Sequence, residues 1–158
     1  GSESVSIEVG GQSYEAGGVS YDPDADISIL DVPNLPSAPL QFADGEAPSG
    51  TDGIVMGYPG GGDFTATPAR VREIIELNGP DIYRTTTVTR EVYTIRGTVK
   101  QGNSGGPMIN RSGKVLGVVF GAAVDDADTG FVLTADEVAR QMARVGNVDR
   151  VPTGTCIS

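Results

Sequence analysis

The feature that most constrains the fold is the way in which glycine and proline divide the chain into short apolar segments. The 158 residues include 23 glycines and 10 prolines, and the apolar residues between them mostly alternate with polar ones. Alternation places successive side chains on opposite faces of a strand, whereas a helix would need a period near 3.6. The chain is therefore predicted to be mainly β, and many short strands with glycine-rich turns favour a barrel or a sandwich.

The predicted strands are bounded by turn residues. In the first of them, Val5, Ile7 and Val9 would share one face. The proline-rich, polar stretch 31–50 is predicted to be a connector rather than a pair of strands. The predicted strands are 4–9, 26–32, 53–58, 69–77, 91–99, 114–120 and 129–134.

One helix is predicted near the C-terminal end, over 134–146. Thr134 and Glu137 have the spacing of a capping box, and Gly146 is a typical helix stop. The apolar stripe of this helix would consist of Val138, Met142 and Val145.

Charge and apolar content exclude several classes of function. The formal charge of -10 and the pI near 4.3 disfavour nucleic acid and anionic lipid as partners. No apolar run is long enough to cross a membrane, so we expect any leader or anchor to lie outside this sequence. Cys156 is the only cysteine, and no histidine accompanies it, so it is not predicted to be a catalytic thiol.

The stretch "KQGNSGGPMIN", residues 100–110, holds a serine between glycines. A serine nucleophile needs a base for its proton and donors for the oxyanion that follows. The glycines permit a sharp turn in which the backbone N–H groups of Gly102 and Ser104 converge, so these two are the predicted oxyanion hole. The alternative is an ordinary turn in a glycine-rich protein.

The string "GNSGGP", residues 102–107, resembles the chymotrypsin-like serine proteases, and in particular their HtrA branch. Members of this superfamily carry histidine, aspartate and serine in that order along the chain. The segment "YDPDADISIL" is similar to the one in which the orienting aspartate precedes an apolar strand, which implies Asp26 as that residue and Ser104 as the nucleophile. Asp22 and Asp24 are the chemical alternatives. Asp26 could instead be a strand-start residue that binds local amides.

The chain contains no histidine, and the resemblance implies where the base belongs. In the family it lies upstream of the aspartate, so we expect the sequence to begin after it. The implied fold is a chymotrypsin-like double β-barrel with an incomplete first barrel and connector over 1–45, and a complete second barrel with a C-terminal helix over 46–158. Without the histidine this chain alone is expected to be inactive or nearly so.

A closer resemblance covers most of the chain through segments 55–75, 79–83, 92–109, 115–138 and 154–158. These segments resemble the membrane-anchored periplasmic serine proteases of mycobacteria and related actinobacteria, which are associated with acid resistance. The resemblance implies an upstream membrane anchor, a location on the periplasmic face of the membrane, and protein or peptide substrates from the cell envelope. It also implies a disulfide between Cys156 and a cysteine in the upstream segment that supplies the histidine.

Alignment with the family places the strand 118–122 along the substrate cleft, where an extended peptide can pair with it. The substrate-binding candidates are Thr98, Val119, Phe120 and Gly121. No charged residue is placed at the base of the cleft, so an apolar or small side chain is expected before the scissile bond. Phe120 could equally belong to the core.

No metal or cofactor is predicted. The stretch "DDADTG", residues 125–130, resembles a calcium loop but lacks its distal glutamate, so a surface turn is predicted. Two alternatives to an enzyme remain open: a peptide-binding module on a protease-like scaffold that has lost catalysis, and an acidic structural β-domain in which Ser104 occupies a turn.

Overall fold

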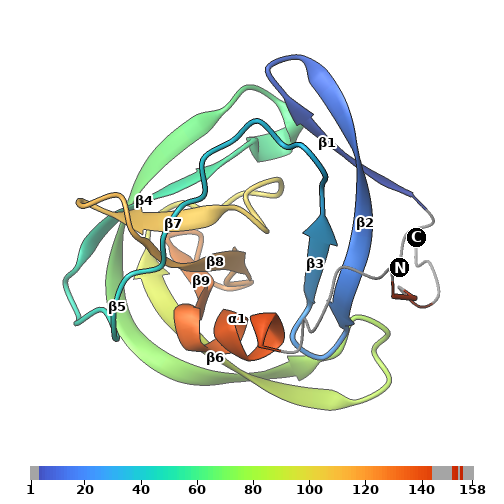
Figure 1. Ribbon diagram of the computed structural model, residues 1–158. Helices are drawn as coiled ribbons and strands as arrows, with labels where there is room; N and C mark the ends of the chain where they lie inside the picture. The colour runs from blue at the N-terminus through green and yellow to red at the C-terminus, as the bar shows by residue number, and fades with distance from the viewer. Residues whose placement is uncertain (1–3, 144–150, 153, 155–158) are drawn as a thin grey trace. The chain divides into compact units, whose positions relative to one another are not determined.

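The computed structural model describes residues 4–143, 151–152 and 154. Over these residues the chain is mainly β, as predicted, and Figure 1 traces it from β1 in blue to α1 in orange-red. The strands are β1 (Val5–Val9), β2 (Gln12–Asp22), β3 (Ile27–Asp31), β4 (Asp52–Gly57), β5 (Thr65–Pro80), β6 (Thr87–Arg96), β7 (Pro107–Asn110), β8 (Val115–Ala122) and β9 (Thr129–Thr134). The helical segments are η1 (Pro59–Gly61) and α1 (Ala135–Met142).

Contacts divide the chain into two compact units. The first consists of residues 1–39, 78–88 and 139–158, and the second of residues 40–77 and 89–138. The predicted domain boundary between residues 45 and 46 divides the sequence at one point, whereas each of these units combines separate segments of the chain. That boundary stays a prediction.

The first unit contains an antiparallel sheet in the order β1-β2-β3. Val9 pairs with Gln12, so Gly10 and Gly11 alone connect β1 to β2, and both have positive φ angles of 58° and 79°. A two-residue turn of this kind matches the twist of the flanking strands and needs residues that tolerate positive φ. These three strands form an open sheet.

Strand β2 was not predicted from the sequence. Gly17 and Gly18 lie in its interior, where glycine weakens the alternating pattern that identifies a strand. The register against β3 shifts between Gly18 and Ser20, which places Val19 in a bulge. Val19 is nevertheless buried, so the bulge serves to turn an apolar side chain inward.

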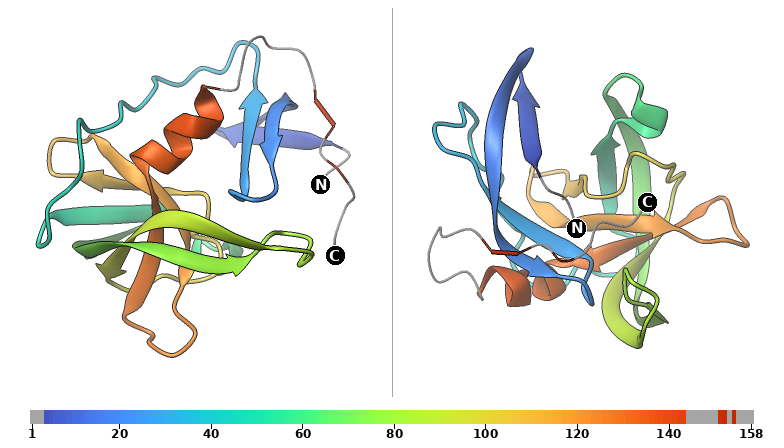
Figure 2. Two further views of the ribbon diagram at one scale, coloured as in Figure 1. Left: turned by 90° about the horizontal axis from the view of Figure 1, so that it is seen from below. Right: turned by 90° about the vertical axis from the view of Figure 1, so that its right-hand side faces the viewer.

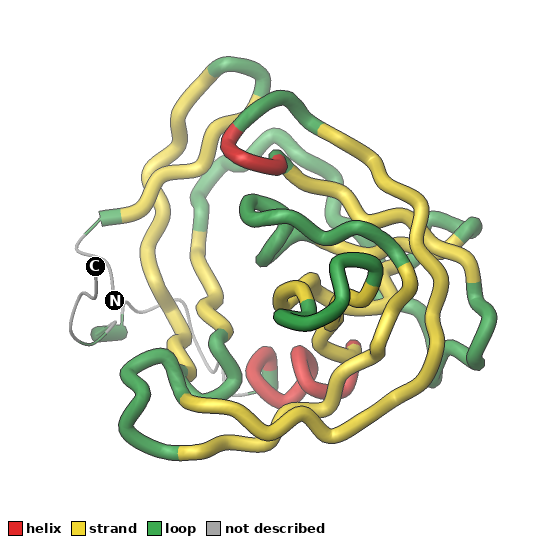
Figure 3. The backbone as a smooth tube through the Cα atoms, turned by 180° about the vertical axis from the view of Figure 1, so that it is seen from behind, coloured by secondary structure: helices red, strands yellow, loops and turns green. Residues whose placement is uncertain are grey.

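The second unit is a closed barrel in the order β4-β5-β6-β9-β8-β7, completed by pairing between β4 and β7. This confirms the predicted complete second barrel. The long strands β5 and β6 are the green ribbons of Figure 2, and Figure 3 shows how little of the backbone is helical. The barrel is filled by Val55, Ala69, Val71, Tyr93, Ile95, Val99, Met108, Leu116, Val119 and Val132.

The connector between β3 and β4 contains no strand, as predicted. Within the described residues it has one isolated β-bridge, a parallel one between Phe42 and Val115, and its end bonds to Val71 of β5. The Ala47 N–H donates to Tyr93 Oη at 2.8 Å, which satisfies a phenol that is otherwise buried in the barrel.

Helix α1 begins after Thr134, whose Oγ1 accepts from the Glu137 N–H at 3.2 Å. The Glu137 carboxylate also accepts from the Glu91 N–H of β6, which links the start of the helix to the barrel. Val138 is buried, but Met142 is 51% exposed, so the predicted apolar stripe is only partly correct. Val145 and Gly146 lie outside the described residues. Among the helices that the structure describes, none has the length and apolar character needed to span a membrane.

Candidate active site

Ser104 lies in the loop 97–106 that connects β6 to β7, and the residue is exposed. Its Oγ donates to the Phe120 carbonyl of β8 at 3.1 Å. Two backbone hydrogen bonds fold the loop on itself, from the Asn103 N–H to the Lys100 carbonyl and from the Gly106 N–H to the Asn103 carbonyl, both at 3.0 Å. The hydroxyl is therefore held at the surface by a tightly turned backbone.

The orientation of two peptide groups bears on the predicted oxyanion hole. The Gln101 carbonyl accepts from the Gly60 N–H at 2.7 Å, and in a planar trans peptide the N–H of Gly102 must point the opposite way. The bond from Gly106 fixes the Asn103 carbonyl in the same manner and so directs the Ser104 N–H away from it. Within the described part of the chain, neither N–H meets an acceptor. Both remain available to an oxyanion, and their assignment to one stays a prediction.

Close packing explains why the loop is rich in glycine. A Cβ at Gly102, where φ is +97°, would lie 2.3 Å from the Tyr58 carbonyl oxygen, and one at Gly106 would lie 2.2 Å from that of Met56. The Tyr58 N–H also donates to the Gly102 carbonyl at 3.3 Å. The serine loop therefore rests directly on the end of β4 and on η1, at distances that only glycine allows.

A β-bulge in β8 shapes the other side of the serine loop. The register against β9 shifts between Val119 and Gly121, which leaves Phe120 out of the ladder with its carbonyl toward Ser104. Bulges often redirect a group near an active site in this way. Neither the bulge nor the contact with η1 was predicted, because both depend on pairings between distant segments.

The four predicted substrate-binding residues differ in what they can offer. Val119 is 1% exposed, and its N–H and carbonyl are bonded to Gly106 and Gly105, so it has no group free for a substrate. Phe120 is half-buried, with the Arg90 guanidinium 4.9 Å from its ring centroid. Gly121 is half-buried and Thr98 is exposed. The more accessible of the four are therefore Phe120, Gly121 and Thr98, and their role in substrate binding stays a prediction.

Asp26 closes the turn between β2 and β3 in the first unit and is exposed, with φ at +58°. Aspartate is one of the few residues other than glycine that adopts this left-handed conformation readily. Asp22 has a local role, because its Oδ1 accepts from the N–H groups of Asp24 and Ala25 at 2.9 and 3.1 Å. Asp26 and Ser104 belong to different units, so their partnership stays a prediction.

A tyrosine pair lies close to Asp26. The hydroxyls of Tyr21 and Tyr83 share a hydrogen bond of 2.9 Å, and the Ile82 N–H donates to the Pro23 carbonyl. Burial, the bond to Tyr83 and the charge of Asp26 raise the pKa of Tyr21 to about 12. The turn that carries Asp26 is thus fastened to the tip of the β5–β6 hairpin.

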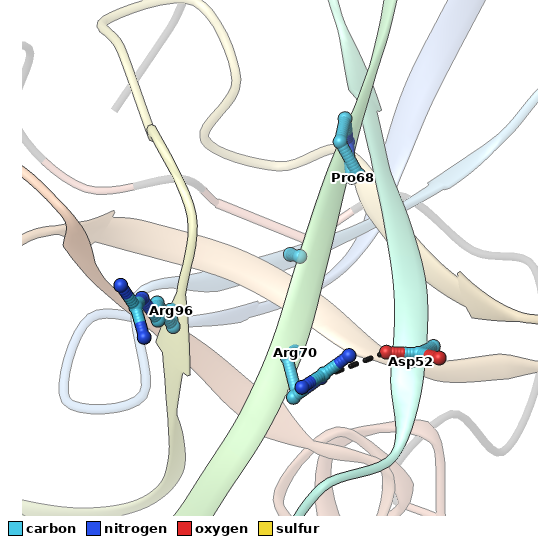
Figure 4. Close-up of a pocket in the computed structure, with 5 residues that line it drawn as sticks. Asp52, Pro68, Arg70 and Arg96 are labelled. Atoms are coloured by element: carbon cyan, nitrogen blue, oxygen red, sulfur yellow. Dashed lines mark hydrogen bonds and ion pairs between the residues drawn. The ribbon is translucent and has the colours of Figure 1, made fainter.

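A pocket of about 340 Å³ on the exposed side of the barrel is not a candidate active site. It is lined by Asp52, Pro68, Ala69, Arg70 and Arg96, and Figure 4 shows Arg70 directed at Asp52. Arg70 Nε donates to one carboxylate oxygen at 2.9 Å and Arg111 to the other at 3.0 Å. The hydrogen bond and charge of Arg70 lower the pKa of Asp52. The lining contains no hydroxyl, thiol or imidazole, and both oxygens of its carboxylate are paired with arginines.

Glu46, Glu91 and Asp136 form an acidic group in the second unit, with carboxylate oxygens within 4.8 Å of one another. Thr134 Oγ1 already donates to Glu91 at 2.7 Å. In the stretch that resembles a calcium loop, Asp126 accepts from the Asp128 N–H and from Thr129 Oγ1, which is the bonding of a surface turn. The predicted disulfide residue Cys156 lies outside the described residues.

Comparison with known proteins agrees with this arrangement. A trypsin-like peptidase domain matches residues 2–118. The serine protease Rv3671c of Mycobacterium tuberculosis is 60% identical over 159 aligned positions, which cover 100% of this chain and 40% of that protein. The chain thus spans less than half the length of this curated relative.

Solved structures give the same result. The active form of the Rv3671c protease from M. tuberculosis superimposes with a TM-score of 0.95 at 60% identity, over 100% of this chain and 70% of that one. The HtrA-type protease AlgW, in a complex with a tripeptide, has a TM-score of 0.73 at 21% identity, over 89% of this chain and 47% of that one, and supports the fold alone. The chain belongs to the trypsin-like peptidase family, the serine proteases with the chymotrypsin-like fold.

Proposed function

We propose that this chain carries the nucleophile, the oxyanion hole and part of the substrate cleft of a serine endopeptidase. The general base would be a histidine in a preceding segment of the same protein, since the chain itself contains none. The observation that carries the proposal is the serine loop: an exposed hydroxyl next to two N–H groups that no described acceptor uses.

In the proposed reaction, Ser104 Oγ attacks the carbonyl carbon of the scissile peptide bond while the histidine removes the hydroxyl proton. The N–H groups of Gly102 and Ser104 would stabilise the negative oxygen of the tetrahedral intermediate. The histidine then donates the proton to the leaving amine, and water hydrolyses the acyl-enzyme by the same route. Asp26 would hold the imidazole in the required tautomer.

Labelling with an active-site fluorophosphonate tests this proposal. The longer native protein should label at Ser104 and cleave peptides, and Ser104→Ala should abolish both. The 158-residue chain alone should label at a rate lower by several orders of magnitude, because it has no base. A longer protein that neither labels nor cleaves any peptide would contradict the assignment.

The finer expectations rest on the resemblance to the membrane-anchored proteases of actinobacteria. We propose that the native protein faces the periplasm, is anchored by preceding sequence, cleaves cell-envelope proteins under acid stress, and joins Cys156 to an upstream cysteine. Support comes from 60% identity to Rv3671c. Protease accessibility in spheroplasts and non-reducing mass mapping of Cys156 would check the location and the disulfide.

A peptide-binding module without catalysis, on the same protease-like scaffold, is the second candidate. The residue that precedes the first sheet at the family's histidine position distinguishes the two. A histidine there favours the enzyme, and any other residue favours the binding module.

A further inference from the structure

Two large aromatic side chains lie exposed beside η1. Tyr58 is 59% exposed and Phe64 is 55% exposed, and their ring centroids are 5.8 Å apart in an edge-to-face arrangement. Edge-to-face packing is a favourable geometry for aromatic rings, and the two rings together present contiguous apolar surface to solvent, which is the kind of surface that ligand grooves use. Nothing in the reaction described above uses these rings.

The backbone that carries this pair is fixed to the serine loop. The Tyr58 N–H donates to the Gly102 carbonyl, and the Gly60 N–H donates to the Gln101 carbonyl. The Tyr58 carbonyl oxygen is also the atom that excludes a side chain at Gly102. The aromatic pair is therefore attached to the peptide group that presents the Gly102 N–H.

The opposite side of the serine loop is fixed to β8. The Gly105 N–H donates to the Val119 carbonyl at 2.8 Å, and Ser104 Oγ donates to the Phe120 carbonyl. Strand β7 pairs with β8 only as far as Val118, and among the described strands no other pairs with Phe120–Ala122 on that side, so we call this segment the free edge of β8. Ser104 thus lies between this free edge and the segment 58–64.

A substrate bound as an added strand would run from the free edge of β8, past Ser104, to the segment 58–64. Residues before the scissile bond would pair with the free edge of β8, where the Phe120 carbonyl can accept an N–H. The scissile carbonyl would then lie at Ser104 with its oxygen toward Gly102. The chain after the scissile bond would continue beyond the serine loop and reach the aromatic pair.

We propose that Tyr58 and Phe64 form a subsite for an apolar side chain on the leaving-group side of the scissile bond, at the first or second residue after it. This inference rests on the proposed function and deepens it. The two rings offer apolar surface and no charge, so they would favour aliphatic or aromatic side chains over glycine and acidic residues at that position.

The test uses the longer native protein and matched internally quenched peptides that carry leucine or glycine at the first or the second position after the scissile bond. The measured quantity is the ratio of kcat/KM for the leucine and glycine peptides. We expect a ratio of about 10 or more in the native protein, the usual discrimination of an apolar pocket, and a ratio near 1 in Tyr58→Ala/Phe64→Ala. Because it is a ratio, it does not depend on the amount of active enzyme.

Single and control variants sharpen the result. Phe64→Ala alone should give an intermediate ratio, and Tyr58→Phe should keep most of the preference. Leu40→Ala is the matched control, because Leu40 is 54% exposed but adjoins Gln41, which bonds to Val115 at the other end of β8. It should leave the ratio unchanged.

The outcomes separate the two proposals. If the native protein cleaves peptides without a leucine preference, or if the preference survives in the double variant, the subsite is wrong and the enzyme assignment stands. If it cleaves no peptide and does not label, the proposed function fails and the subsite fails with it.

Discussion

At the scale of single residues, the serine loop depends on glycines that have no Cβ atom to collide with neighbouring backbone. Gly102 and Gly105 both have positive φ angles, +97° and +83°, but only Gly102 is packed against other backbone. A side chain at Gly105 would therefore cause only the strain of a left-handed backbone, whereas one at Gly102 would also collide with neighbouring atoms. This difference also identifies which glycine holds the predicted oxyanion peptide in place.

Gly102→Ala should lower kcat/KM of the native protease by about 10²–10³-fold, the loss expected when one oxyanion donor is misplaced. The reason is the 2.3 Å approach of the new Cβ to the Tyr58 carbonyl oxygen, which must displace the peptide. Gly105→Ala is the control, since its Cβ would meet nothing within 4 Å and only the left-handed strain of ~1–2 kcal/mol applies. Equal losses in the two variants would contradict this account. Steady-state kinetics and fluorophosphonate labelling measure both.

At the scale of elements, the start of α1 is tied to the barrel through a side-chain network. Thr134 Oγ1 accepts from the Glu137 N–H and donates to Glu91, while the Glu137 carboxylate accepts from the Glu91 N–H. The capping spacing in the sequence correctly predicted the first bond. The link to β6 required the fold, because Glu91 lies 46 residues before Glu137.

Thr134→Val should destabilise the protein by about 2 kcal/mol, because it removes a helix cap and leaves the buried groups around it without partners. Thr134 is 2% exposed, so solvent cannot replace the lost bonds. Thr134→Ser keeps the hydroxyl and should cost less than half as much. Urea unfolding of both variants gives the free energies, and a valine variant as stable as the parent would show that the network contributes little.

At the scale of the whole molecule, the response to alkaline pH should depend on the tyrosines whose pKa the fold raises, Tyr21 and Tyr93 among them. The pKa of Tyr21 is raised to about 12, chiefly by burial and then by its bond to Tyr83. The fold therefore favours the neutral phenol. Its contribution to stability is complete below the ordinary tyrosine pKa near 10 and is lost as the pH rises from there through about 12.

The expected result is a fall in thermal stability between pH 10 and pH 12 that is smaller in Tyr21→Phe. The phenylalanine variant is needed because the chain carries a formal charge of -10, and growing repulsion destabilises any such protein in alkali. Melting curves by circular dichroism at pH 9 and pH 11.5 make the comparison, with absorbance at 295 nm to follow ionisation. An identical fall in both proteins would mean that Tyr21 is not the group responsible.

The sequence by itself determined the β class, the strands with regular alternation, the helix start at Thr134 and the glycine-bracketed Ser104. These follow from local patterns, because the types of neighbouring residues are enough to predict the local backbone conformation. The resemblance to a known family added the expectation of two barrels and the choice of Asp26 over its neighbours.

Only the tertiary structure decided which segments meet. It added β2, whose glycines hide its pattern, the bulge that turns the Phe120 carbonyl to Ser104, and the contact of η1 with the Gln101 carbonyl. It also showed that Val119 is buried and that its backbone groups bond to Gly105 and Gly106, while its role as a substrate-binding residue stays a prediction. The physical reason is common to all of these: each depends on hydrogen bonds or packing between strands far apart in the chain, and no local sequence pattern records its distant partner.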